Sequence, residues 1–162
     1  MSRLDSAIRR LEAQRDCLAF AAELMDTLIG NVLELGLGNG RTYDHLRALL
    51  PGREIFAFDR KIAAHPDCIP DDDHAILGDF SETLPATFRR LGQETALAHC
   101  DTGSGDSEAT RAQAAWLGPA VDPLLVPGAL VLSDQRLSVA GWCDVNIPES
   151  VAPGRYYMYR KD

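Results

Sequence analysis

The stretch VLELGLGNGRTYDHLR, residues 32–47, decides the fold of this chain. It begins with a short apolar run that ends at Leu35 and continues into a turn with three glycines at alternate positions, Gly36, Gly38 and Gly40. The residues after the turn space their apolar side chains as a helix does, so the order is strand, tight turn, helix. Glycine is needed where the backbone takes positive φ or where a ligand lies almost against the main chain. The turn is therefore typical of a nucleotide-binding loop.

The glycine spacing argues against a dinucleotide-binding fold. Dinucleotide-binding folds use G-x-G-x-x-G, whose third glycine lets the helix pack on the strand. Arg41 occupies that third position here, so the dinucleotide pattern fails. A glycine-rich turn by itself is a weak signal, and an ordinary strand-to-helix connection without a ligand is the alternative. The strands that follow decide whether this turn binds a cofactor or only connects a strand to a helix.

The length of 162 residues suits one domain, with a central sheet and helices on both faces. We expect a single domain over residues 1–162, made of an N-terminal helical segment, 1–29, and an α/β core, 30–162. No apolar run approaches the ~20 residues of a membrane span, so we expect no membrane partner. The start of the chain is too charged for the core of a signal peptide, and a cytoplasmic location is the default.

The net charge of −8 bounds the choice of partner. A surface of this sign repels phosphate backbones, which disfavours DNA or RNA as a bulk substrate and favours a small molecule or a protein. The four cysteines are far apart and lack any C-x-x-C pair, as expected of reduced, buried thiols. They are Cys17, Cys68, Cys100 and Cys143.

Residues 3–28 are predicted to form one long helix before the glycine turn. Leu4, Leu11, Leu18 and Met25 follow one another at intervals of seven. Such a stripe has to be buried, either against the sheet or against a second copy of the chain. A homodimer through this helix is therefore one of two predicted arrangements.

Acidic residues end the next three predicted strands. Asp59 lies near the end of the run 54–60, about 20 residues past the glycines. In cofactor folds of this kind an acid at that position binds the ribose, because a carboxylate accepts from both hydroxyls. Asp79 ends the strand in 74–80, and Asp101 ends the one after it. The alternatives are a solvated loop aspartate for Asp59 and a helix-capping role for Asp79.

The rest of the chain completes the sheet. A fifth strand within 123–135 ends at Asp134. Before it, residues 110–117 are predicted to be helical up to the glycine-proline pair that follows. Two further extended segments, around 142–147 and 155–160, fit an antiparallel pair at the edge of the sheet.

The ends of these strands should meet, because ligands bind at the carboxyl ends of the strands in an open α/β sheet. Five residues at these ends would share one crevice: Gly36, Asp59, Asp79, Asp101 and Asp134. Together with the E-x-G-x-G-x-G turn, this arrangement resembles the class I S-adenosylmethionine (SAM) methyltransferases, and within them a compact bacterial branch of unassigned substrate. The resemblance covers most of residues 30–160.

The resemblance implies a Rossmann-like, doubly wound α/β sheet of seven strands, mostly parallel with an antiparallel final pair, preceded by an N-terminal helix. It implies in-line transfer of a methyl group from SAM to an oxygen or nitrogen of a small molecule, with S-adenosylhomocysteine as the product. Scarcely any helix lies between the fifth strand and the final pair, which departs from the usual pattern of the substrate-facing wall. A SAM-binding sensor or scaffold without turnover is the alternative. An NAD-linked oxidoreductase is disfavoured by Arg41 and by the lack of a Y-x-x-x-K pair.

The resemblance also assigns roles to single residues. Glu34 would order the turn and meet the amino end of the methionyl group, and Thr42 would hydrogen-bond its carboxylate, which the start of a helix also favours. Asp59 and Arg60 would face the ribose, while Asp79 and the residue after it would face the adenine. The full set expected to bind the cofactor is Glu34, Gly36, Leu37, Gly38, Asn39, Gly40, Arg41, Thr42, Asp59, Arg60, Asp79, Phe80 and Asp101.

Asp101 and Asp134 are the predicted catalytic residues. The sulfonium already activates the methyl group, so the protein has chiefly to align the acceptor, exclude water and remove a proton from a hydroxyl. With Gln135, the two acids resemble the Asp and Asp-Asn pair that hold Mg²⁺ in catechol-type O-methyltransferases. The favoured interpretation has no metal, and Mg²⁺ is the minor alternative. No Asn-Pro-Pro-Tyr tetrapeptide follows the fourth strand, which argues against methylation of nucleobase amines.

Overall fold

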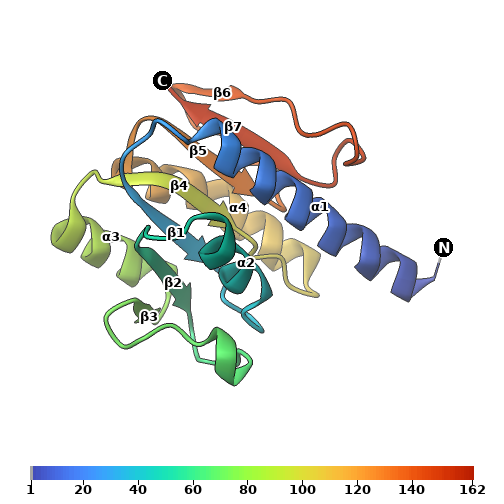
Figure 1. Cartoon of the computed structure of the whole chain (residues 1–162), viewed down its shortest axis with the longest axis horizontal. Helices are drawn as coiled ribbons and strands as arrows, with labels where there is room; N and C mark the ends of the chain where they lie inside the picture. Colours follow the sequence, from blue (N-terminus) through green and yellow to red (C-terminus); the bar gives the residue numbers. More distant parts are fainter. Residues whose placement is uncertain (1) are drawn as a thin grey trace.

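The predicted apolar runs form one seven-stranded sheet in the computed structural model, which describes residues 2–162 (Figure 1). The strands are β1 (Asn31–Leu35), β2 (Ile55–Asp59), β3 (Ala75–Leu77), β4 (Thr95–Cys100), β5 (Leu125–Ser133), β6 (Trp142–Asp144) and β7 (Tyr157–Lys161). Their order is β3-β2-β1-β4-β5-β7-β6. The first five run parallel, and β7 lies antiparallel to both β5 and β6. The predicted Rossmann-like sheet with its antiparallel final pair is therefore confirmed.

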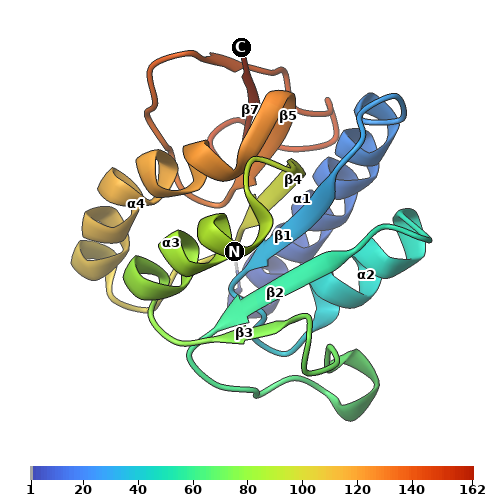
Figure 2. The ribbon, with the colours of Figure 1, turned by 90° about the vertical axis from the view of Figure 1, so that its left-hand side faces the viewer.

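Helices cover both faces of the sheet. They are α1 (Arg3–Leu24), α2 (Arg41–Leu49), α3 (Phe80–Leu91) and α4 (Ser107–Val121), with two 3₁₀ turns, η1 (Pro66–Cys68) and η2 (Asp122–Leu124). Figure 2 shows α1 and α2 on one face and α3 and α4 on the other, and each pair closes its own hydrophobic core. Strands β1 and β4 are buried along their whole length, and the polar residues they contain are paired with one another, Asn31 with Thr95 and Glu34 with His99. Within residues 2–162 none of the helices offers a span long and apolar enough to cross a membrane.

The first helix is shorter than predicted, because it ends at Leu24 rather than near residue 28. The guanidinium of Arg53 lies at this end. It donates hydrogen bonds to the carbonyl oxygens of Met25 (3.3 Å), Leu28 (2.5 Å) and Gly30 (2.9 Å). These carbonyls lie in the turn after the helix, where that of Met25 also accepts from the N–H of Leu28 (3.0 Å), and a cation at the C-terminal end of a helix is favourable. Arg53 therefore holds the turn that leads from α1 into β1.

The apolar stripe of α1 is buried over only half of its length. Leu18 and Met25 are fully buried, whereas Leu4 and Ile8 are 69% and 44% exposed. The beginning of α1 extends past the carboxyl edge of the sheet (Figure 1), where no strand lies beneath it. The sheet therefore accounts for one half of the predicted stripe, and a homodimer through the other half stays a prediction.

The fourth helix continues through Gly118 and Pro119, where the sequence predicted its end. Gly118 and Val121 are buried, so an additional turn of helix brings more surface onto the sheet. A Cβ atom at Gly118 would lie 2.7 Å from Cγ2 of Val139, so a larger residue would crowd this contact. Tertiary packing here outweighs the local preference of a glycine-proline pair to end a helix.

No helix joins β5 to the final strand pair in the described part of the chain, as the sequence predicts. Two loops, 134–141 and 145–156, take that place. They pack on the sheet through the buried side chains of Leu137, Val151 and Tyr156. The missing helix is thus compensated by apolar residues within the loops.

We predict that Arg53→Met lowers the free energy of unfolding by about 2–3 kcal/mol, because the charged donor to three carbonyl groups is lost while the apolar stem is kept. Urea denaturation measures this change. Arg89→Met, an exposed arginine on α3, is the matched control and should change stability by less than about 0.5 kcal/mol. Equal effects of the two substitutions would contradict the role of Arg53.

Candidate active site

A cavity of about 780 Å³ lies at the carboxyl edge of the sheet. Its walls come from the glycine turn, the ends of β2, β3 and β4, and the helices α1 and α4. Ligand pockets typically hold roughly 300–1,000 Å³, so this cavity has room for a cofactor and a small second ligand. All of the predicted cofactor residues line it except Glu34 and Gly40.

The three glycines of the turn serve different contacts. A Cβ atom at Gly36 would lie 2.2 Å from the carbonyl oxygen of Asp101, so glycine lets the end of β1 approach the end of β4. Gly40 begins α2 in the left-handed conformation, and a Cβ there would lie 2.5 Å from Cβ of Cys68. Gly38 has open space around it and lines the cavity. The turn therefore leaves its main chain bare toward a ligand.

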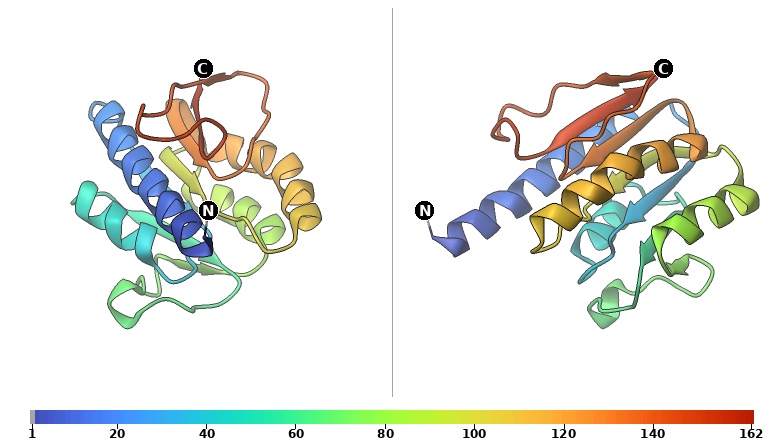
Figure 3. Two further views of the ribbon diagram at one scale, coloured as in Figure 1. Left: turned by 90° about the vertical axis from the view of Figure 1, so that its right-hand side faces the viewer. Right: turned by 180° about the vertical axis from the view of Figure 1, so that it is seen from behind.

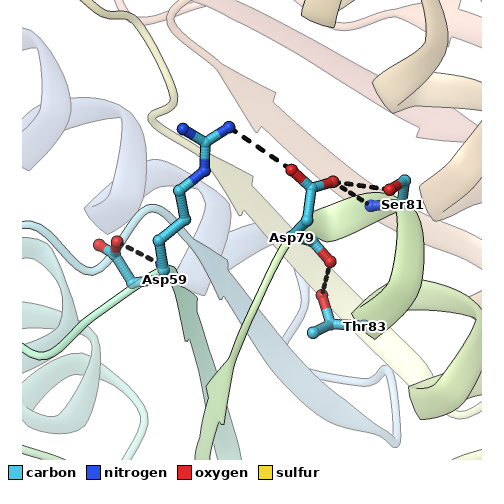
Figure 4. Close-up of polar contacts among 5 residues, drawn as sticks. Asp59, Asp79, Ser81 and Thr83 are labelled. Atoms are coloured by element: carbon cyan, nitrogen blue, oxygen red, sulfur yellow. Dashed lines mark hydrogen bonds and ion pairs between the residues drawn. The ribbon is translucent and has the colours of Figure 1, made fainter.

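Asp59 lines the cavity at the end of β2, as the sequence predicts. One carboxylate oxygen accepts from the N–H of Gly38 (2.9 Å) and the other from the N–H of Arg60 (2.7 Å). Figure 4 shows the second contact. A carboxylate has about four lone-pair sites, so both oxygens can still accept a hydroxyl. The glycine turn thus orients this side chain for a diol.

Asp79 is the N-cap of α3 (Figure 4). One oxygen accepts from the N–H (2.9 Å) and the hydroxyl (2.7 Å) of Ser81, and the other faces the Arg60 guanidinium at 3.5 Å. The hydrogen bond from the Ser81 side chain holds the pKa of Asp79 below its ordinary value. The capping alternative is therefore what the structure shows, and the predicted contact with adenine stays a prediction.

Glu34 differs from its expected place. Its carboxylate is fully buried beneath the glycine turn instead of facing the cavity. It accepts the hydroxyl hydrogen of Thr42 and lies 2.6 Å from Nδ1 of His99, whose Nε2 lies 2.5 Å from the hydroxyl of Tyr156. The carboxylate of Glu34 joins β1 to α2 and β4. Its predicted contact with the amino end of the cofactor stays a prediction.

The imidazole of His99 is wholly buried in this network. Burial by itself would lower the pKa of His99, but the charge of Glu34 and the hydrogen bond to it raise the pKa above its ordinary value. The contact with Glu34 therefore favours the protonated form of His99. The sequence analysis gave His99 no role, although Glu34 and His99 each stand one residue before the end of their strands and are direct partners in the parallel register.

Thr42 lines the cavity, but its hydroxyl is committed to Glu34. A threonine hydroxyl has a single hydrogen to donate, and here Glu34 accepts it. The predicted side-chain hydrogen bond to the carboxylate of the cofactor stays a prediction. The N–H groups in the first turn of α2 have no intrahelical partners, and they remain the donors for an anion there.

Asp101 stands at the end of β4 and lines the cavity. Its carboxylate accepts a hydrogen bond from the side-chain amide of Gln14 on α1 at 2.6 Å. Burial is the main cause that raises the pKa of Asp101 above its ordinary value. A carboxylate of this kind is a better proton acceptor than one in water.

Asp134 lies near Asp101 but does not line the cavity. Its oxygens accept from the N–H of Thr102 (3.3 Å), the N–H of Gly103 (3.0 Å) and the amide nitrogen of Gln135 (3.1 Å). This acid therefore holds the loop that follows β4. A catalytic role for Asp134 stays a prediction.

The acids at this edge do not form the ligand set of a Mg²⁺ site. Gln135 turns its amide nitrogen rather than its oxygen toward Asp134, whose oxygens already hold the loop. Within residues 2–162 no three histidine, cysteine or acidic side chains gather closely enough to hold a metal ion. The donor set therefore does not fit the metal that Asp101, Asp134 and Gln135 suggested.

The far wall of the cavity comes from two helices that the sequence analysis did not place there. Arg10, Leu11 and Gln14 line it from α1, and Gln113 and Trp116 line it from α4. Figure 3 shows the two helices on opposite sides of the carboxyl edge. Helical periodicity indicates which side chains share a face but not what that face meets. These residues replace the wall that the missing helix after β5 would form.

The fold, the glycine turn and the acid at the end of β2 define a Rossmann-like methyltransferase. Residues 1–161 match the protein family described as S-adenosyl-L-methionine methyltransferase. A crystal structure of an S-adenosyl-L-methionine methyl transferase from Silicibacter pomeroyi DSS-3 is 42% identical, with a TM-score of 0.95 over 100% of this chain and 99% of that one. The chain belongs to the S-adenosyl-L-methionine methyltransferase family, and SAM is its cofactor.

Weaker similarities concern the fold alone. A putative caffeoyl-CoA O-methyltransferase from Staphylococcus aureus is 13% identical, with a TM-score of 0.57 over 90% of this chain and 82% of that one. The plantazolicin methyltransferase BpumL, in complex with S-adenosylhomocysteine, is 13% identical, with a TM-score of 0.50 over 80% of this chain and 49% of that one. No curated protein matches the chain in sequence.

The buried pair predicts a pH-dependent contribution to stability. Because the pKa of His99 is raised in the folded state, the stabilisation is fully present below the ordinary histidine pKa of about 6.5 and is lost as pH rises through the raised pKa. The stability lost in His99→Gln should therefore be largest near about pH 6 and shrink toward about pH 9. Urea unfolding of both proteins across this range measures it. His65→Gln, at an exposed histidine, is the control, and a loss that is equal at every pH would contradict an ionised pair.

Proposed function

We propose that the protein transfers the methyl group of SAM to a hydroxyl or amino group of a small molecule, with Asp101 as the proton acceptor. The observation that supports this proposal is that one cavity continues from the glycine turn past Asp101 to a second wall on α1 and α4. A binding module for SAM alone would need only the first part. The additional space beside a buried carboxylate is what an acceptor requires.

The cofactor occupies the half of the cavity next to the glycine turn. Asp59 accepts the two ribose hydroxyls, and the N–H groups at the start of α2 bind the carboxylate of the methionyl group. Phe80 covers the adenine, since its half-buried ring lines the cavity and is itself held edge-on by Phe58 at 6.5 Å. Asp79 accepts from the adenine amino group through the oxygen that faces Arg60.

The reaction is an in-line displacement at the methyl carbon. A lone pair of the acceptor oxygen or nitrogen forms the new bond to carbon, the carbon–sulfur bond breaks, and its electron pair leaves with S-adenosylhomocysteine. The proton of the acceptor passes to Asp101, which Gln14 holds in place. Alignment of the two reactants in a closed site supplies most of the acceleration, because the sulfonium already activates the methyl group.

The role of Asp101 is tested by Asp101→Asn in a methyl-transfer assay that records S-adenosylhomocysteine release from a panel of small hydroxylated and aminated acceptors. Removing a general base typically costs about 10²–10⁴-fold in rate, so kcat at saturating SAM should fall within that range. Glu108→Gln, an exposed acid at the start of α4, is the matched control and should retain full activity. Full turnover by Asp101→Asn would overturn the assignment.

The ribose assignment predicts that Asp59→Ala binds S-adenosylhomocysteine roughly tenfold to a hundredfold more weakly, the cost of losing hydrogen bonds to a charged group of ~1.5–3 kcal/mol. Calorimetry measures the affinity, and circular dichroism confirms the fold. Asp72→Ala changes an exposed loop acid and should leave the affinity unchanged. If Asp59→Ala also bound with unchanged affinity, the ribose would have to lie elsewhere.

A further inference from the structure

The wall of the cavity beyond Asp101 has a composition that selects an acceptor. Leu11 on α1 and Trp116 on α4 line it, and each keeps 37% of its surface exposed. These two side chains come from helices that cover opposite faces of the sheet, and both line the same cavity. A partly exposed indole and a partly exposed leucine offer apolar surface to a flat ring, and aromatic rings gain additional energy by stacking on an indole.

One cation of this wall is available to a ligand. The three arginines that line the cavity are Arg10, Arg41 and Arg60. Arg60 lies next to Asp79, and the side chain of Arg41 lies against the amide of Asn39. Arg10 forms no ion pair within residues 2–162. It is nevertheless close enough to Asp101 for its charge to act on the pKa of that acid.

A guanidinium pairs with a carboxylate through two parallel hydrogen bonds. Asp101 already has Gln14 as its partner, so Arg10 remains free for an incoming anion. The protein has a net charge of −8, so its surface does not attract anions in general, and an anion is attracted chiefly to local cations such as Arg10. An acceptor that carries its own carboxylate would therefore find a partner for it in Arg10.

We propose that the methyl acceptor is a small aromatic acid. Its ring lies between Leu11 and Trp116, its carboxylate pairs with Arg10, and its hydroxyl or amino group points to Asp101 and the methyl group of SAM. This inference rests on the proposed function and names the substrate class for the same site. In the transfer the acceptor's proton passes to Asp101 and then to solvent, while the new carbon–oxygen or carbon–nitrogen bond replaces the carbon–sulfur bond.

The carboxylate that Arg10 binds has one competing source, the methionyl group of SAM itself. The two sources differ in which affinity changes when the charge is removed. If Arg10 binds the acceptor, Arg10→Gln leaves the affinity for S-adenosylhomocysteine unchanged and weakens binding of an acid to the complex. If Arg10 binds the cofactor, the affinity for S-adenosylhomocysteine falls.

The test compares acids with their uncharged isosteres. The protein saturated with S-adenosylhomocysteine is titrated by calorimetry with the 2-, 3- and 4-hydroxybenzoates, the corresponding aminobenzoates, and the primary amide of each. We expect at least one acid to bind tenfold or more tightly than its amide, the effect of a charged hydrogen-bonded pair. Arg10→Gln should abolish that preference, and Trp116→Leu should weaken acid and amide alike. Arg9→Gln, the adjacent arginine of α1 outside the cavity, should preserve the preference.

Two results would overturn the proposal. One is that no acid in the panel binds more tightly than its amide; the other is that Arg10→Gln weakens the binding of S-adenosylhomocysteine. Neither result touches the proposed function, which depends on turnover. Methyl transfer to uncharged acceptors that depends on Asp101 but is insensitive to Arg10→Gln would leave the methyltransferase assignment intact while excluding the aromatic acid.

Discussion

The structure depends on the buried, hydrogen-bonded pair of Glu34 and His99. Removing ionisable groups from water is costly, and it is tolerated only when they are paired and their remaining hydrogen-bonding positions are filled. Here Thr42 and Tyr156 fill them from either side, so the chain of contacts joins α2, β1, β4 and the segment before β7. Such a network allows one relative placement of these elements, because any shift would leave a buried charge unpartnered.

The part of the cavity next to the glycine turn, where we propose that the cofactor binds, is held in place by this network. The glycine turn is held from below through Glu34 and Thr42, and from the side through the bond between the N–H of Gly38 and Asp59. The close approach of Gly36 to the main chain of Asp101 brings the ends of β1 and β4 together. The lining of this half is therefore held by hydrogen bonds among its own residues and by the buried Glu34 beneath it, which is how a precise binding geometry is maintained.

The half of the cavity that we propose for the acceptor is built differently. Its side chains stand on α1 and α4, and those of Leu11 and Trp116 remain partly exposed. The long first helix explains this arrangement: its buried half anchors it on the sheet, and its free half carries Arg10 and Leu11 over the cavity. Among residues 2–162 no helix follows β5, and α1 lines this side of the cavity. The proposed cofactor site thus faces a wall in which a few residues of α1 and α4 determine the charge and the apolar surface.

The sequence by itself determined the order and type of the elements, the glycine turn and the acids at the strand ends, because apolar periodicity and the need for glycine are local properties of the chain. The position of Asp59, at the end of β2 and beside the glycine turn, could be predicted from such local signals. Only the tertiary structure decided that Glu34 is buried and pairs with His99, that Asp134 holds a loop, and that Arg10 and Trp116 line one cavity. These outcomes depend on the register between neighbouring strands and on where two helices extend past the sheet, and neither is encoded within any single segment.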